Sequence, residues 1–127
     1  MKLVDTSSWV EYLRDRKSEA GDTVEVLVLS GNAAWCDMTL VELWHGVRGP
    51  KEKRELAEME NEIERIPVDQ ATWRLASKVA LRCRESGITV PISDIVIAGC
   101  AVTHKLELEH CDKHFDDLLP IAKALGT

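Results

Sequence analysis

Apolar residues along the chain fall into two kinds of pattern, and each kind predicts a different element. Short apolar or alternating runs at Leu3-Val4, Ala33–Cys36 and Leu106–His110 predict strands. In the segments between these strands, apolar residues recur three and four positions apart, which predicts helices. The expected helices cover residues 6–16, 21–30, 39 up to a stop at 49–50, 51–65, 69–86 and 92–102, with a last short helix beginning near 115. An extended piece is expected at 66–68 on a sheet edge, and a short strand or tail at 121–125.

The alternation of strands with helices predicts an α/β fold, with a central, mostly parallel sheet and right-handed crossovers. The helix at 92–102 is apolar on all sides apart from Ser93 and Asp94, so we expect it in the middle of the domain. No internal repeat, low-complexity segment or linker divides the sequence. One domain covering residues 1–127 is therefore expected.

The composition of 45% apolar and 30% charged residues is that of an ordinary globular protein. The sequence contains no apolar run long enough to span a membrane and no signal-peptide pattern, so we expect a cytoplasmic protein that does not engage membranes. None of the four cysteines, Cys36, Cys83, Cys100 and Cys111, forms a CxxC pair. Neither a zinc site nor a disulfide framework is expected, and the first three read as core residues.

Four acidic residues are expected at one edge of the sheet. Asp5 and Asp112 each follow a predicted strand, while Glu42 and Asp94 lie in the first turn of predicted helices. Singly, each has a structural explanation: Asp5 and Asp94 as helix caps, Glu42 as the partner of Thr39 in a capping box, and Asp112 as a turn residue. In a parallel sheet, however, all four fall beyond the carboxyl ends of the strands, where open α/β sheets bind ligands.

Several carboxylates gathered at a half-buried edge repel one another, and a divalent cation relieves that repulsion. Oxygen ligands from carboxylates and water are those that Mg²⁺ or Mn²⁺ accepts. A net charge of −6 also fits a protein that holds cations, and it argues weakly against nucleic-acid binding through the overall field. The residues themselves therefore predict a metal site formed by Asp5, Glu42, Asp94 and Asp112.

Four segments together resemble a known family. They are residues 1–7 (MKLVDTS), 39–43 (TLVEL), 93–98 (SDIVIA) and 111–115 (CDKHF). Their order and spacing resemble PIN-domain ribonucleases, and within them the VapC toxins of toxin–antitoxin pairs. The resemblance covers the whole chain. Relatives often carry Thr or Ser two residues before the fourth acid, whereas this sequence has His110 there.

The resemblance implies a metal-dependent endoribonuclease that uses Mg²⁺ or Mn²⁺, with Asp5, Glu42, Asp94 and Asp112 as its acidic site. Asp116, close behind Asp112, is a further candidate for the fourth acid. The implied partners are an RNA substrate, a cognate antitoxin that occupies the acidic groove, and a second copy of the chain in a homodimer.

Two other functions remain open from the residues. A phosphoryl hydrolase could use Asp5 as its nucleophile, although such sites usually need a second Asp two residues later, where this chain has Ser7. An RNA- or protein-binding module with a vestigial site is the other alternative. Two sets of basic residues are interpreted first as solvated faces, Arg48 with Lys51, Lys53 and Arg54, and the row Arg74, Lys78 and Arg82. His114 is expected at the surface, with contact to the substrate as the alternative because it is close to Asp112. All four tryptophans are expected in core stripes, with a dimer or partner surface as the alternative for some of them.

Overall fold

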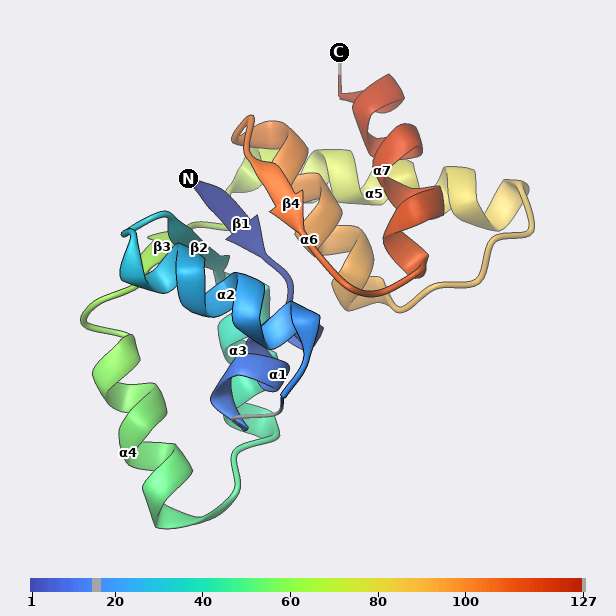
Figure 1. Ribbon diagram of the computed structural model, residues 1–127. Helices are drawn as coiled ribbons and strands as arrows, with labels where there is room; N and C mark the ends of the chain where they lie inside the picture. Colours follow the sequence, from blue (N-terminus) through green and yellow to red (C-terminus); the bar gives the residue numbers. More distant parts are fainter. Residues whose placement is uncertain (15–16, 127) are drawn as a thin grey trace.

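The computed structural model describes residues 1–14 and 17–126, and a four-stranded parallel sheet lies at its centre (Figure 1). Its strands are β1 (Lys2–Val4), β2 (Ala33–Cys36), β3 (Glu64–Ile66) and β4 (Glu107–Glu109), in the order β3-β2-β1-β4. Leu3 of β1 pairs with Ala34 of β2 on one side and with Leu108 of β4 on the other. The predicted α/β fold with a parallel sheet is confirmed.

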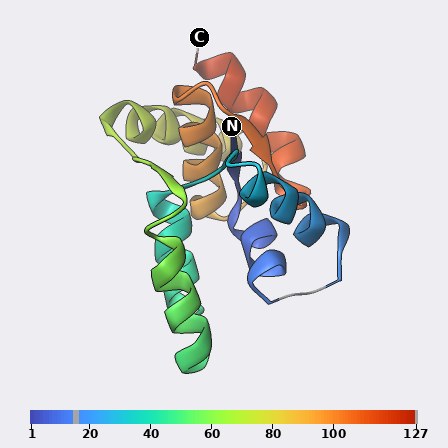
Figure 2. The same cartoon turned by 60° about the vertical axis from the view of Figure 1, so that its left-hand side comes forward.

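Helices cover both faces of the sheet, because successive strand residues point to opposite sides. Leu3, Ala34 and Cys36 pack in the core formed with α5 (Gln70–Glu85), α6 (Ile92–Thr103) and α7 (His114–Leu125). Val4, Ala33 and Trp35 pack in a second core, formed with α1 (Thr6–Leu13), α2 (Glu19–Leu29), α3 (Asp37–His45) and α4 (Gly49–Met59). Helix α4 projects away from the sheet (Figures 1 and 2). Among the described residues, no helix combines the length and apolar character needed to cross a membrane.

Helix α6 is buried as its sequence predicted, with a continuous run of buried residues from Ile95 to Ala101. Asp69 caps α5 as predicted, since its carboxylate accepts a hydrogen bond from the Thr72 N–H at 2.9 Å. Helix α1 ends at Leu13, and the expected end at 16 lies outside the described residues. Among the tryptophans, Trp9 and Trp35 are fully buried, but the prediction for Trp73 was wrong, because it is 48% exposed.

The capping box predicted at Thr39 was wrong. Helix α3 begins two residues earlier, at Asp37, and Cys36 occupies the N-cap position without a side-chain cap bond. Thr39 is instead fully buried inside the first turn, with its hydroxyl 3.7 Å from Cys36 Sγ. Glu42 is therefore free of the capping role that its spacing suggested.

The helix predicted at 51–65 was too long. Helix α4 starts at Gly49, with Pro50 in its first turn, where the missing proline N–H has no intrahelical partner to lose. It ends at Met59, and residues 64–66 form β3, with Arg65 paired to Trp35 of β2. Pairing with a buried neighbouring strand outweighs the helix propensity of this charged segment. Strand β3 occupies a sheet edge, as expected for the extended piece at 66–68, but the strand is shifted toward the N-terminus and includes only Ile66 of that piece.

The end of the chain also differs from expectation. Residues 121–125 continue α7 and form neither a strand nor a tail. Pro120 lies inside this helix, where it removes one backbone donor. Phe115, Leu118 and Ala122 are fully buried along one side of α7, and this packing keeps the helix continuous across the proline.

Candidate active site

Asp5 lies at the carboxyl end of β1 and is 2% exposed. Its Oδ1 accepts a hydrogen bond from the Ser8 N–H at 3.0 Å, so Asp5 does cap α1. This bond engages only one of its two carboxylate oxygens. Burial raises the pKa of Asp5, and the negative charge of Asp94 adds to that rise, while the bonds to Ser8 and the nearby His110 oppose it. A carboxylate with a raised pKa at a strand end fits chemistry better than a purely structural cap.

Glu42 reaches the same region from the second turn of α3. The Thr6 hydroxyl donates a hydrogen bond to Glu42 Oε1 at 2.7 Å, and it lies 3.2 Å from the Thr39 hydroxyl. Thr6 is the first residue of α1, directly after Asp5. The early start of α3 therefore brings Glu42 beside Asp5 through a bridging hydroxyl.

Asp94 and Asp112 approach each other from the first turn of α6 and the loop before α7. His114 lies between them, with Nδ1 2.9 Å from Asp94 Oδ2 and 3.1 Å from Asp112 Oδ1. The three atoms lie within 4.8 Å of one another. The His114 N–H also donates to Asp112 Oδ1 at 3.0 Å, which fixes the carboxylate at the start of α7.

The acids affect one another electrostatically. Burial raises the pKa of Asp94 most, and the negative charges of Asp112 and Glu42 raise it further, against the opposing effect of His114. The charge of Asp94 in turn raises the pKa of Asp5. The four candidate acids therefore form one electrostatic group, drawn from β1, α3, α6 and the segment after β4.

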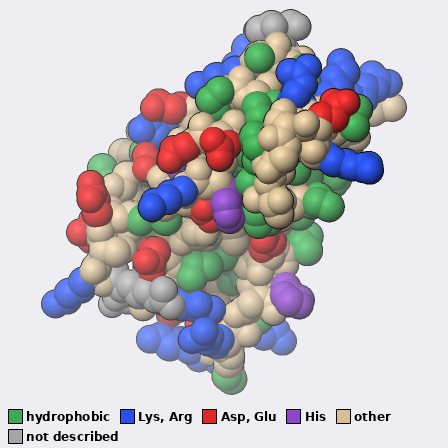
Figure 3. All heavy atoms as spheres, turned by 90° about the vertical axis from the view of Figure 1, so that its right-hand side faces the viewer, with side chains coloured by type: hydrophobic (Ala, Val, Ile, Leu, Met, Phe, Trp, Pro, Cys, Tyr) green, Lys and Arg blue, Asp and Glu red, His purple; other side chains and the backbone are tan. Residues whose placement is uncertain are grey.

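The strand order explains why they meet. From β1 the chain moves outward to β2 and β3, and then crosses back to place β4 on the other side of β1. The carboxyl ends of β1 and β4 thus flank a topological switch point, the usual ligand position in open α/β sheets. Figure 3 shows one face of the molecule, on which acidic side chains gather across the middle with a histidine and a basic side chain among them, while most Lys and Arg lie toward the top and bottom.

The structure does not bring every candidate into this group. Asp116 lies in the first turn of α7, where it is exposed, and it is absent from the cluster of Asp94, Asp112 and His114 in the described residues. Asp117 instead lies near Cys83 of α5. Burial is the main cause of the raised pKa of Cys83, and the negative charge of Asp117 raises it further. The basic residues of the two sets are exposed, as expected for solvated faces.

His114 lies at the surface, as expected, but the sequence alone did not show its contact with both Asp94 and Asp112. Its side chain is 41% exposed, but the ring is held between two acids. The signal available was its position two residues after Asp112 and directly before Phe115, the buried anchor of α7. Because α7 begins at residue 114, the side chain at this position lies close to the carboxyl end of β4.

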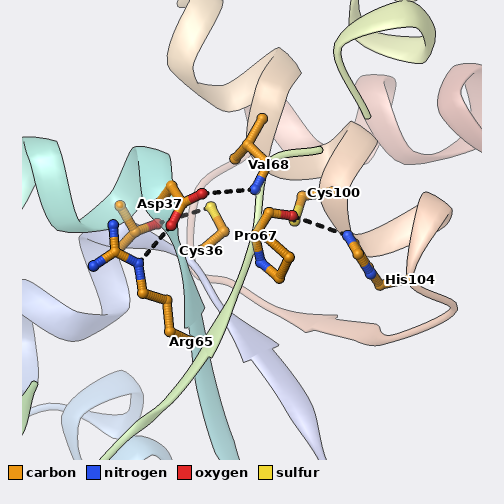
Figure 4. Close-up of polar contacts among 8 residues, drawn as sticks. Cys36, Asp37, Arg65, Pro67, Val68, Cys100 and His104 are labelled. Atoms are coloured by element: carbon orange, nitrogen blue, oxygen red, sulfur yellow. Dashed lines mark hydrogen bonds and ion pairs between the residues drawn. The ribbon is translucent and has the colours of Figure 1, made fainter. Parts of the chain in front are cut away.

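A further acid at a strand end, Asp37, has its charge balanced by neighbouring residues. Asp37 follows β2 directly, and its carboxylate accepts from Arg65 Nε and from the Val68 N–H, the latter at 2.8 Å (Figure 4). These partners outweigh the opposing effect of burial and lower the pKa of Asp37. Asp37 therefore belongs to the joint between β2 and β3, outside the acidic group.

The donor set fits a divalent cation. It combines several carboxylate oxygens with one imidazole nitrogen, at a half-buried position where two carboxyls have raised pKa values. The contacts described for these acids include no Lys or Arg, in contrast to Asp37. A bound cation would supply the missing positive charge.

Comparison with known proteins gives a consistent family. The PIN domain model matches residues 2–118. Ribonuclease VapC11 of Mycobacterium tuberculosis is 33% identical over 120 residues, covering 91% of this chain and 90% of that protein. Among solved structures, DNA-bound VapBC from Salmonella typhimurium aligns with a TM-score of 0.75 at 21% identity, covering 93% of each chain. VapBC-5 from M. tuberculosis aligns with a TM-score of 0.69 at 25% identity, covering 92% of this chain and 89% of that one. On this evidence the chain belongs to the PIN domain family, in its VapC branch.

Proposed function

We propose that this protein is a metal-dependent endoribonuclease and the toxin of a toxin–antitoxin pair. The observation that carries the proposal is the convergence of Asp5, Glu42, Asp94 and Asp112 at the switch point between β1 and β4. Its VapC relatives are named as ribonucleases, which supports RNA as the substrate. The proposed cation is Mg²⁺ or Mn²⁺.

The acidic residues would then have distinct roles in the cleavage reaction. When bound, a divalent cation would neutralise a phosphodiester anion, lower the pKa of a water molecule and stabilise the leaving oxygen. Asp5, Asp94 and Asp112 would hold the cation. Glu42 is oriented by the Thr6 hydroxyl, which leaves its other oxygen for a water molecule or a proton. The Ser8 N–H fixes Asp5, so the buried carboxylate cannot rotate away when substrate binds.

A groove between α1, α2 and α4 offers a surface for the antitoxin. It has a volume of about 970 Å³, and its lining combines acidic residues such as Asp22 and Glu25 with the basic residues Arg14, Arg48 and Lys51. A smaller pocket shares Leu13, Arg14 and Glu52 with the groove and extends to Glu42, but the described lining of neither pocket includes Asp5, Asp94 or Asp112. Solved neighbours of this chain are VapBC complexes, which supports such a partner.

We further propose that the chain forms a homodimer and acts in the cytoplasm, where RNA is available. Trp73 and Leu81 of α5 are 48% and 55% exposed and give that helix an apolar strip that a second copy could cover. All four cysteines are free thiols, which suits a reducing compartment.

The decisive test is cleavage of a defined RNA by the purified chain. Cleavage is expected with Mg²⁺ or Mn²⁺, and it should stop with excess chelator and return when metal is restored. Mapping the RNA ends would exclude a contaminating metal-independent ribonuclease. A folded protein that binds RNA with no metal-dependent cleavage would favour the alternative of a binding module with a vestigial site.

The fourth acid is tested by three single variants at matched folding. Asp112→Asn should weaken metal binding and cleavage strongly, because Asp112 lies in the cluster with Asp94. Asp116→Asn should have a much smaller effect, and Asp117→Asn serves as the control near α5. A larger loss in Asp116→Asn than in Asp112→Asn would overturn this assignment.

The toxin role is tested by expression. Growth should stop when the chain is expressed alone and resume when a cognate antitoxin is co-expressed. Harmless expression of a folded, RNA-cleaving protein would contradict the toxin role while leaving the nuclease intact. A phosphoryl hydrolase using Asp5 would instead release phosphate from small monoesters, with RNA left uncut.

A further inference from the structure

The His114 ring is held in place more firmly than a surface histidine. The backbone N–H of His114 donates a hydrogen bond to the Asp112 carboxylate, and the next residue, Phe115, is fully buried as the anchor of α7. His110 packs its ring against Phe115, with centroids 5.1 Å apart, and so supports the same turn. The first turn of α7 therefore positions the His114 imidazole between the carboxylates of Asp94 and Asp112.

The two distances from His114 Nδ1 are those of a hydrogen bond, and they are also those of neighbouring ligands around one ion. Two ligands at right angles, each about 2.1 Å from a metal ion, are about 3 Å apart. His114 Nδ1 lies 2.9 Å from Asp94 Oδ2 and 3.1 Å from Asp112 Oδ1. One imidazole nitrogen thus has the separation from each carboxylate oxygen that octahedral neighbours require.

We propose that His114 Nδ1 is a direct ligand of the metal ion, beside Asp94 and Asp112, and that it makes the site select a first-row transition cation over Mg²⁺. The inference rests on the proposed function, because it concerns the cation of the same site. Mg²⁺ is held by oxygen ligands and water, whereas imidazole nitrogen suits transition ions. Ligation uses the tautomer that carries its proton on Nε2.

A different role for His114 makes a different prediction. As a hydrogen-bond clamp it would hold the two carboxylates in position without touching the ion. Removing a clamp changes the affinities for Mg²⁺ and for transition ions in the same proportion. Removing a nitrogen ligand lowers the affinity for transition ions much more than the affinity for Mg²⁺.

The test is metal binding to the full chain, stripped of metal, measured by calorimetry with Mg²⁺, Mn²⁺ and Co²⁺. In His114→Asn, we expect Co²⁺ affinity to fall by at least about tenfold, as for loss of a metal-supporting group. The loss should be smaller for Mn²⁺, which accepts oxygen ligands more readily, and smallest for Mg²⁺. His114→Asp replaces the nitrogen with an oxygen and should shift the preference toward Mg²⁺. His45→Asn, an exposed histidine in the last turn of α3, is the matched control and should change nothing.

A spectroscopic readout avoids dependence on activity. The Mn²⁺-loaded protein should show coupling to an imidazole nitrogen in pulsed electron paramagnetic resonance, and His114→Asn should lose it. Circular dichroism would verify that the variants are folded. Absence of this coupling in the unmodified protein, or a parallel loss of affinity for all three ions, would overturn the inference while leaving a metal-dependent nuclease. Failure of any divalent ion to bind the unmodified protein would overturn the proposed metal site as well.

Discussion

Asp5 and Asp37 each follow one of two neighbouring strands, yet their surroundings shift their pKa values in opposite directions. Each directly follows a parallel strand at the same edge of the sheet. Asp37 has a guanidinium and a backbone N–H as partners, and its pKa is lowered despite partial burial. Asp5 has the Ser8 N–H and the nearby His110, with no Lys or Arg among its described partners, and burial raises its pKa. Strand-end position alone therefore does not decide how the charge of an acid is balanced; its partners do.

The strand order explains the difference. On one side, β2 has β3 as its neighbour, and β3 carries Arg65 opposite Trp35 toward the end of β2. On the other side, β1 has β4 as its neighbour, and the segment after β4 carries another acid, Asp112, three residues beyond the strand. Negative charge is thus neutralised at the joint between β2 and β3 and accumulates at the joint between β1 and β4. We expect the two joints to respond to mutation in opposite ways.

The largest expected difference is in catalysis. Asp94→Asn should reduce RNA cleavage by at least about a hundredfold, the usual cost of removing a key electrostatic group. Asp37→Asn should leave cleavage nearly unchanged, because Asp37 is engaged by Arg65 and Val68. Rates are compared at saturating metal, with both variants verified as folded. Equal losses in the two variants would mean that the joint between β2 and β3 also belongs to the active site.

A smaller difference is expected in stability without metal, and here the signs should be opposite. Asp37→Asn should lower the free energy of unfolding at neutral pH by about 1 kcal/mol, since the lost ion pair is partly exposed and screened by solvent. Asp5→Asn should raise it, because asparagine keeps the cap while removing a poorly solvated charge. Urea denaturation with chelator present measures both. A destabilised Asp5→Asn protein would show that the carboxylate charge is itself stabilising.

The smallest expected effect is the pH dependence of these contributions. The raised pKa values of Asp5 and Asp94 mean that their contribution to stability is fully present below the ordinary value of 3.8 and is lost as pH rises through the folded-state values. The lowered pKa of Asp37 gives a contribution that is present above 3.8 and lost as pH falls through its folded-state value. Unfolding of the metal-free protein and of Asp5→Asn and Asp37→Asn, across acidic to neutral pH, separates the two trends. Saturating metal should suppress the loss attributed to Asp5 and Asp94.

The fold and the edge that carries the site follow from local sequence patterns. The run Leu3-Val4 followed by Asp5, and the buried helix headed by Asp94, need only periodicity and the rule for parallel sheets. Local patterns could not separate Asp37 from Asp5, because Arg65 reaches Asp37 through a strand that the sequence favoured as helix. Thr39 with Glu42 fits a capping box, but the buried packing of Thr39 shifts the helix start by two residues. The contact of His114 with Asp94 could not be predicted for the same reason, since it depends on where α7 begins.

The pairing of β1 with β4 has a consequence for synthesis of the protein. Lys2 lies opposite Glu107, so the first strand of the chain finds one of its two neighbours only after more than a hundred residues have been made. Closing so long a loop is slow compared with forming local structure. The acidic group likewise needs Asp112 and the start of α7 before it exists. Under the proposed function, a nascent chain on the ribosome therefore has no assembled acidic group, and we expect it to cleave RNA only after the last helix folds.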